Sequence, residues 1–104
     1  MGALDYLQWL RQQVRDRNYV LTRHAEIERL EEDIDIVEVE EALLSARILE
    51  DYPNDPRGAC CLLLGFARRR PLHAICADRQ GRLLIVTVYR PLRPHWVAPD
   101  RRGN

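Results

Sequence analysis

Two histidines, a tyrosine and a threonine are the side chains of this sequence best suited to moving protons. His24 and His73 are candidate acids or bases, because the unperturbed pKa of histidine lies near neutral pH. Tyr89 can donate a proton or stack on a ring, and Thr87 can orient a neighbouring group through its hydroxyl. These residue types indicate acid–base chemistry.

Three arginines are candidates for holding a phosphate group, because a guanidinium can donate two parallel hydrogen bonds to an oxyanion. They are Arg29, Arg57 and Arg90. By contrast, His73 and Cys76 lie three residues apart in an expected strand, where such residues point to opposite faces. The sequence therefore predicts no metal site, and no pattern in it indicates a cofactor.

Most of these candidates also have a structural interpretation. His24 lies at the edge of an expected apolar helix stripe, so it can be a hydrogen-bonded core histidine. Arg29 has acidic neighbours at helical spacing and can form an exposed ion pair. His73, Thr87 and Tyr89 can simply pack across strands. The sequence leaves both interpretations open.

The length and composition are those of one globular domain. The chain has 104 residues, of which 46% are hydrophobic and 31% charged. It contains no apolar run near the roughly 20 residues that span a bilayer, and its N-terminus lacks the pattern of a signal peptide. We therefore expect a cytoplasmic protein that does not associate with membranes, with its three cysteines reduced.

The net charge is zero, but the charges are unevenly distributed along the chain. Residues 26–56 carry twelve acidic residues against two arginines, a net charge of −10. Residues 57–104 carry ten arginines against two aspartates, a net charge of +8. The basic half could face RNA or an acidic partner, or the two halves could neutralise each other within the fold.

Helical spacing of apolar residues predicts three helices in the first half. The first spans residues 3–16 and is amphipathic. The second is capped by Thr22 and is expected to bury a stripe of Ile27, Leu30 and Ile34.

The third helix opens at Asp35, whose spacing from Glu38 is that of a capping box, and ends near Ala46. Its expected buried face consists of Ile36, Val39, Leu43 and Leu44.

Four strands follow the third helix. A short extended segment at residues 19–21 lies earlier, between the first and second helices. The expected strands are Ile48–Tyr52, Cys60–Phe66, Leu72–Ala77 and Arg82–Tyr89, with one hairpin turning at residues 68–70. We therefore predict an α+β fold in which the N-terminal helices pack on one face of a four-stranded antiparallel meander.

The turn at residues 78–81 sets the expected register of the last two strands. A three-residue loop ending in Gly81 would pair Asp78 with Arg82 and His73 with Thr87. The open face of the sheet would then carry His73, Ile75, Ile85, Thr87 and Tyr89. The helix-covered face would carry Leu72, Ala74, Cys76, Leu84, Val86 and Val88.

Several segments, taken together, resemble a known family. The run YVLTRHA at 19–25, ILEDYP at 48–53, Leu72-His73 and IVTVY at 85–89 resemble a bacterial domain of unknown function, family 4258. The resemblance covers residues 19–91, which leaves an N-terminal helical extension at 1–18 and an irregular tail at 92–104. The family is grouped by fold with the barnase–EndoU–colicin–RelE proteins, so a RelE-like fold is implied.

That resemblance implies a metal-independent ribonuclease or a toxin of a toxin–antitoxin pair, acting on RNA or the ribosome and bound by a cognate antitoxin-like protein. His24 and His73 would then be the acid and base, Tyr89 a proton donor or stacking platform, and the three arginines phosphate clamps. The neutral total charge and the acidic segment favour an alternative, a non-catalytic protein-binding module with a degenerate toxin fold. The helix at 3–16 could also mediate a homodimer.

Overall fold

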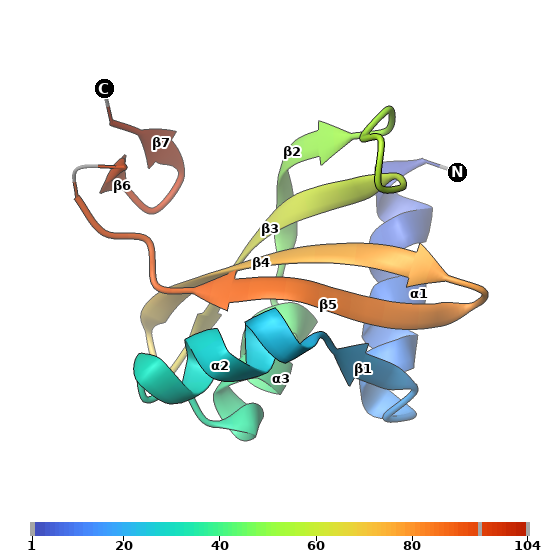
Figure 1. Cartoon of the computed structure of the whole chain (residues 1–104), viewed down its shortest axis with the longest axis horizontal. Coiled ribbons are helices and arrows are strands. Elements are labelled where there is room, and N and C mark those ends of the chain that lie inside the picture. The colour runs from blue at the N-terminus through green and yellow to red at the C-terminus, as the bar shows by residue number, and fades with distance from the viewer. Residues whose placement is uncertain (1, 94, 104) are drawn as a thin grey trace.

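A mixed five-stranded sheet and three helices form the fold (Figure 1). The computed structural model describes residues 2–93 and 95–103, so positions 1, 94 and 104 of the expected N-terminal extension and tail lie outside the described residues. The helices are α1 (Ala3–Arg15), α2 (Arg23–Glu31) and α3 (Ile36–Leu44). The strands are β1 (Tyr19–Leu21), β2 (Arg47–Tyr52), β3 (Cys60–Ala67), β4 (Arg70–Arg79), β5 (Arg82–Tyr89), β6 (Trp96–Ala98) and β7 (Arg101–Arg102).

The sheet order is β1-β5-β4-β3-β2, and this corrects the predicted four-stranded antiparallel meander. The α+β class is confirmed, but the segment 19–21 is a fifth strand, paired parallel to β5 with Tyr19 opposite Leu83 and Leu21 opposite Ile85. Three residues are too few to show an alternating pattern, so the sequence indicated an extended segment without its partner.

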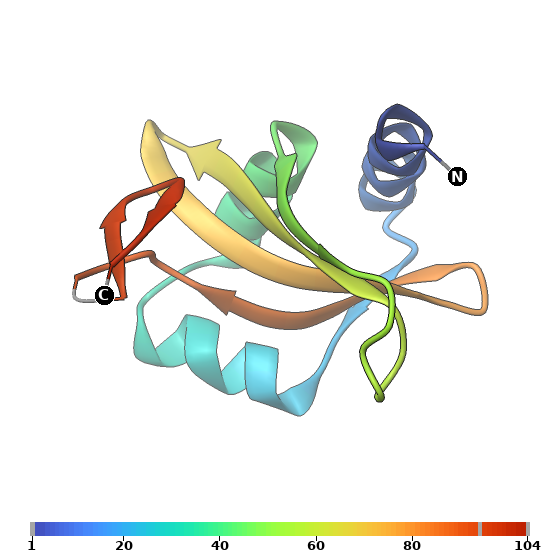
Figure 2. The same cartoon turned by 90° about the horizontal axis from the view of Figure 1, so that it is seen from above.

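One face of the sheet is covered by α1 and α3, and the main core lies between them and the strands (Figures 1 and 2). Tyr6, Leu7 and Trp9 of α1 pack against this core, while Leu4 is 67% exposed. The buried members of the core are Leu10, Val14, Ala25, Ile34, Val39, Ala42, Leu43, Ala46, Cys61, Leu63, Ala67, Leu72, Ala74, Cys76, Leu83, Ile85 and Val88.

The third helix approaches β3 so closely that only glycine fits beneath it. A Cβ atom on Gly65 would lie 1.8 Å from the carbonyl oxygen of Ala42. At the end of α3, the Ser45 hydroxyl accepts a hydrogen bond of 3.0 Å from the backbone N–H of Phe66. These two contacts fix α3 on the sheet.

The predicted start of α3 is confirmed, whereas its predicted buried face is only partly right. The Asp35 carboxylate caps the helix by accepting the N–H of Glu38 at 2.8 Å. Val39 and Leu43 are buried, but Leu44 is 37% exposed because the helix ends there and the chain turns into β2.

The predicted apolar stripe of the second helix is only partly right, because Ile34 is buried as expected but Ile27 and Leu30 are not. The Thr22 cap is confirmed, since its side chain accepts the N–H of Ala25 at 3.0 Å. However, Ile27 is 46% and Leu30 is 65% exposed, so these two residues do not face the core. Figure 2 shows α2 on the opposite side of the strands from α1 and α3.

Carboxylates dock α2 on the edge of β5. Beyond the short strand β1, the backbone N–H groups of Val88 and Arg90 donate to Glu28 and Glu32, each at 3.1 Å. An unpaired strand edge needs acceptors, and the two glutamates, one helical turn apart, supply them. This requirement turns the isoleucine and leucine of the stripe outward.

The predicted register of β4 and β5 is wrong along the whole strand pair, and His73, for example, pairs with Tyr89 instead of Thr87. Arg79 pairs with Arg82, so the loop has two residues rather than three, with Gln80 and Gly81 both at positive φ. Asp78 stabilises it by accepting the N–H of Gly81 at 2.8 Å. Two consecutive residues at positive φ form a tight hairpin turn. The sequence Asn-Gly is typical of such a turn, and Gln-Gly indicates it less clearly.

A bulge in β5 then shifts the pairing once more. Cys76 lies opposite Ile85 and Ile75 opposite Thr87, so Val86 has no partner in β4. Ile85 faces the core, where it is fully buried, while Leu84 and Val86 line the other face. Each of these three placements is opposite to the prediction, because the two-residue turn moves the register by one residue.

The same bulge restores the predicted grouping at the far end of the strands. His73 lies opposite Tyr89, and Ile75 opposite Thr87, so His73, Thr87 and Tyr89 share one face. We call this face, which α1 and α3 leave uncovered, the open face.

The expected irregular tail instead folds into a small two-stranded sheet, β6 with β7. Trp96 is 5% exposed and packs edge-on against His73, with ring centroids 4.4 Å apart. Arg102 holds Glu50 of β2 through two hydrogen bonds of 2.6 and 2.7 Å. The hairpin therefore covers one end of the open face.

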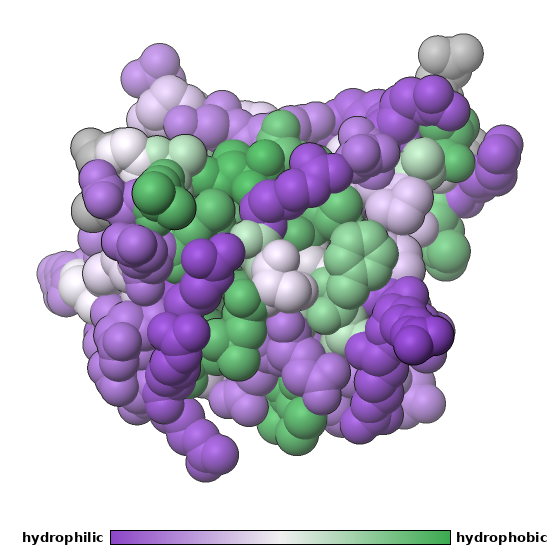
Figure 3. All heavy atoms as spheres, turned by 180° about the vertical axis from the view of Figure 1, so that it is seen from behind, coloured by the Kyte–Doolittle hydropathy of each residue, from purple (hydrophilic) through white to green (hydrophobic). Residues whose placement is uncertain are grey.

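Hydrophobic side chains also reach the outer surface in several places between hydrophilic ones, as the view from behind shows (Figure 3). Among the described residues, no helix is both long and apolar enough to cross a membrane.

Candidate functional site

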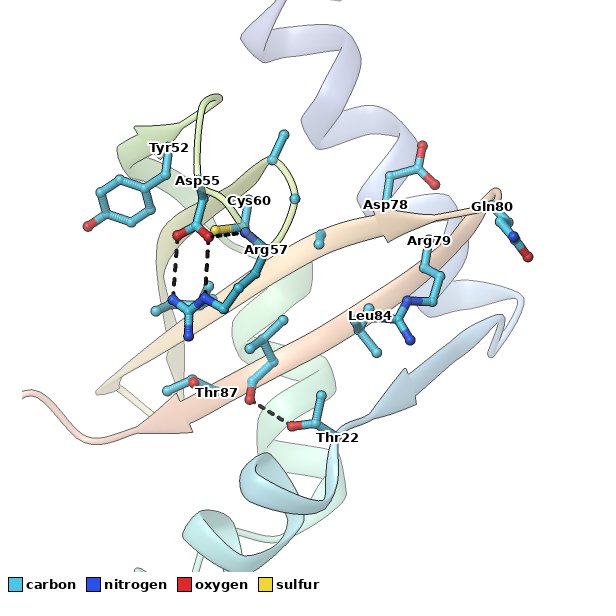
Figure 4. A pocket seen from close by; sticks show the side chains of 15 residues that line it. Thr22, Tyr52, Asp55, Arg57, Cys60, Asp78, Arg79, Gln80, Leu84 and Thr87 are labelled. Atoms are coloured by element: carbon cyan, nitrogen blue, oxygen red, sulfur yellow. Dashed lines mark hydrogen bonds and ion pairs between the residues drawn. The ribbon is translucent and has the colours of Figure 1, made fainter.

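A groove of about 580 Å³ lies on the open face, between the loop after β2 and the β4–β5 hairpin (Figure 4). Its floor is apolar and comes from β4 and β5, whereas its rim carries hydroxyl, guanidinium, carboxylate and thiol groups. The lining residues are Thr22, Tyr52, Asp55, Arg57, Gly58, Ala59, Cys60, Ile75, Ala77, Asp78, Arg79, Gln80, Leu84, Val86 and Thr87.

The loop on one rim presents Arg57 to the solvent. Its side chain is 89% exposed and its guanidinium contacts the Asp55 carboxylate at 3.3 Å, and Asp55 also accepts the backbone N–H of Arg57 at 2.9 Å. These contacts lower the pKa of Asp55 and raise that of Arg57, so both groups remain charged. The pair keeps Arg57 at the rim with donors free on its outer side.

The opposite rim is formed where β1 runs into α2. The Thr22 hydroxyl donates to the carbonyl of Val86 at 2.7 Å, the residue at the bulge of β5 (Figure 4). Thr87 is the next residue along β5 and also lines the groove. The bulge therefore brings two threonines to the same wall.

A free thiol completes the lining. Burial raises the pKa of Cys60, so its sulfur is protonated at neutral pH. The groove therefore has a neutral thiol, two arginines and two aspartates around its apolar floor.

The histidine on the open face, His73, has no access to solvent. His73 is fully buried, and burial lowers its pKa. Its Nε2 lies 2.7 Å from the carbonyl oxygen of Pro99, and its Nδ1 lies 3.1 Å from the Tyr89 hydroxyl. Since a carbonyl can only accept, Nε2 carries the proton, and neutral Nδ1 accepts from Tyr89. The C-terminal hairpin covers this pair.

Two of the predicted phosphate clamps are engaged inside the fold. Arg90 donates to Glu38 at 3.0 Å, and the two side chains are only 12% and 7% exposed. Arg29 pairs with Glu26 and donates to the carbonyl of Ile34 at 3.1 Å, which holds the chain just after α2.

His24 is an exposed imidazole on the helix that Thr22 of the groove wall caps. It lies in the first turn of α2, two residues after Thr22, and is 66% exposed. Its Nε2 lies 3.2 Å from a carboxylate oxygen of Glu28, the same oxygen that accepts the N–H of Val88. An Nε2 proton donated to Glu28 leaves Nδ1 free as the basic nitrogen.

The structure thus divides the seven predicted site residues. Arg57 and Thr87 line the groove, and His24 is exposed in the first turn of α2; the other four make internal contacts. Sequence reasoning missed Tyr52, Cys60, Arg79 and Gln80 as lining residues, and assigned Thr22 only as a helix cap. Had the sequence been interpreted as a two-residue turn at Gln80-Gly81, it would have indicated Arg79 and Gln80. No local sequence pattern indicates the bulge.

The described residues contain no group of three or more His, Cys, Asp or Glu side chains arranged to hold a metal ion. The fold and the groove are those of a small α+β domain with a ligand-sized groove on the uncovered face of its sheet. Residues 21–90 match the family described as domain of unknown function DUF4258, and the chain belongs to that family. No curated protein and no solved structure matched the chain.

Proposed function

We propose that this protein is a RelE-like, metal-independent ribonuclease that binds RNA in the open-face groove and uses His24 as its acid–base group. The observation that carries the proposal is the exposed, carboxylate-bound imidazole of His24, placed in the first turn of the helix that Thr22 of the groove wall caps. The apolar floor of the groove suits a base, and the guanidinium of Arg57 suits a phosphate.

The reaction this arrangement suits is attack of a ribose 2′-oxygen on the adjacent phosphorus. The 2′-OH proton passes to Nδ1 of His24, a 2′,3′-cyclic phosphate forms, and the 5′-oxygen leaves with a proton from the resulting imidazolium. Glu28 stabilises that imidazolium, and Arg57 offsets the negative charge that develops on the non-bridging phosphate oxygens.

Cleavage of single-stranded RNA, free and on translating ribosomes, tests the proposal. With a chelator present, the wild type should cleave, and His24→Ala should slow cleavage by about 10² or more. Arg57→Ala should weaken binding and slow cleavage. His95→Ala is the matched control, because His95 is exposed but lies in the C-terminal segment, and it should leave cleavage unchanged. A wild type without activity, or a His24→Ala variant of equal activity, counts against the proposal.

A second candidate function is non-catalytic binding of another protein. It is favoured by the internal engagement of His73, Tyr89 and Arg90, and by the outward-facing Ile27 and Leu30 of α2. A partner that co-purifies without nucleic acid, and is lost when Ile27 and Leu30 are both changed to glutamate, would support it. Both residues are exposed, so those changes should leave the fold intact.

A further inference from the structure

The β3–β4 hairpin ends in a turn made entirely of arginines. Ala67 pairs with Arg70, so Arg68 and Arg69 form a two-residue loop. Both have positive φ, 52° and 66°, in the left-handed region that disfavours residues with a Cβ atom. Each arginine therefore costs the fold free energy that glycine or asparagine would largely avoid.

The second hairpin of the same sheet provides a comparison within the molecule. It has the same loop length, with Gln80 at φ 53° and Gly81 at φ 87°. There, glycine occupies the second left-handed position at little cost. Because the same turn can be built with glycine, turn geometry does not account for arginine at both positions of the first hairpin.

Contacts within the fold do not account for these arginines either. Arg68, Arg69 and Arg70 are all exposed. Arg68 approaches Asp35 at 3.8 Å, but both side chains are more than half exposed, and such pairs stabilise a protein little. Among the described residues, Arg69 and Arg70 have no ion-pair partner.

An exposed aromatic residue lies two positions before the first arginine of the turn. Phe66 precedes the turn on β3, opposite Pro71, and is 43% exposed. Exposed rings beside guanidinium groups are the elements with which proteins hold single-stranded nucleic acid, the ring stacking on a base and the cations contacting phosphates.

We propose that the arginine tip, Arg68 to Arg70, binds the phosphate backbone of single-stranded RNA, with Phe66 stacking on a base. The inference rests on the proposed function in taking RNA as the partner, but it concerns a separate surface, since none of these residues lines the groove. The strain of the turn is then retained because the side chains bind RNA.

Binding of a labelled single-stranded oligoribonucleotide, measured between 50 and 200 mM salt, tests this inference. A double variant, Arg68→Asn with Arg69→Gly, removes two charges and relieves the strained turn. Its melting temperature should rise, while its affinity for RNA falls. The slope of log K against log salt should decrease by about 0.7 for each phosphate that the tip no longer neutralises. A variant that is more stable and yet binds less tightly cannot be explained by unfolding.

Two controls separate charge from turn geometry. Arg68→Lys combined with Arg69→Lys keeps the charge and the strain, and should preserve most of the salt slope. Phe66→Ala should weaken affinity at all salt concentrations without changing the slope, because stacking involves no phosphate.

The outcomes distinguish this inference from the proposed function. If the double variant with Arg68→Asn and Arg69→Gly keeps its affinity and slope, the arginine-tip inference is overturned and the ribonuclease proposal stands. A wild type that binds without cleaving overturns the ribonuclease proposal, and a reduced slope then still supports the tip. A wild type that does not bind RNA overturns both.

Discussion

The hydroxyl of Thr22 donates a hydrogen bond of 2.7 Å to the carbonyl of Val86, the residue that the bulge leaves without a partner in β4. The same oxygen accepts the N–H of Ala25 and caps α2. One side chain therefore caps a helix, donates a hydrogen bond to the carbonyl of the bulge residue and lines the groove. The position of α2 beside the groove depends on it.

Thr22→Ala should lower the free energy of unfolding by about 2 kcal/mol, because it removes a helix cap and leaves the Val86 carbonyl without its donor. Urea unfolding measures the change. Thr22→Ser keeps the oxygen that makes both hydrogen bonds and should cost less than half as much. Equal destabilisation in the two variants would show that the methyl group, not the hydroxyl, carries the effect.

Gly65→Ala should be among the most destabilising single changes in the chain. The new Cβ would meet the Ala42 carbonyl at 1.8 Å, and backbone cannot move aside as a flexible side chain can. Displacing α3 should cost about 3 kcal/mol or more, measured by thermal or urea unfolding. Gly2→Ala, whose Cβ would meet Asp5 at an ordinary 3.7 Å, is the control and should be nearly neutral.

The neutral, buried state of His73 predicts a pH dependence of stability. Burial lowers its pKa below the ordinary value of 6.5 that applies when the chain is unfolded. The unfolded state therefore binds more protons at mildly acidic pH, and stability should fall as the pH drops below about 6.5. His73→Gln should remove that part of the dependence in urea unfolding between pH 5 and 8. The exposed His24, changed to Gln, should leave it in place.

The Glu50–Arg102 contact should hold the C-terminal hairpin on the open face. The two hydrogen bonds from Arg102 lower the pKa of Glu50 from 4.5 to about 2. The stabilisation is therefore complete above pH 4.5 and declines as the pH falls toward 2. Glu50→Gln should cost about 1 kcal/mol at neutral pH, and amide exchange in β6 should accelerate. Arg47→Gln removes the more exposed pair with Asp100 and should have a smaller effect.

Helix starts were predictable because their signals are local. Thr22 and Asp35 each accept an N–H from a residue three positions later, and a short stretch of sequence contains everything that such a cap requires. The α+β class followed from the change in apolar spacing between the two halves of the chain. Thr87 and Arg57 were candidates because of the chemistry of their side chains, and both line the groove.

The orientation of α2 was not predictable, because it is set by unpaired backbone N–H groups on another element, the strand β5. Its apolar residues Ile27 and Leu30 predicted a buried stripe, but the edge of β5 required acceptors, and Glu28 and Glu32 turn toward it. That edge exists only because β1 is too short to cover it. Such a requirement becomes visible only when the strands have been assembled.

The sequence by itself determined the three helices and the four longer strands, since caps, turns and apolar spacing act over a few neighbouring residues. Only the tertiary structure decided which polar groups are free. The tight turn moved two residues from the expected core into the groove, and the bulge kept Thr87 on the groove face. The C-terminal hairpin sealed His73 while His24 remained exposed. Register and coverage depend on contacts between distant segments, and burial then determines which side chains can meet a ligand.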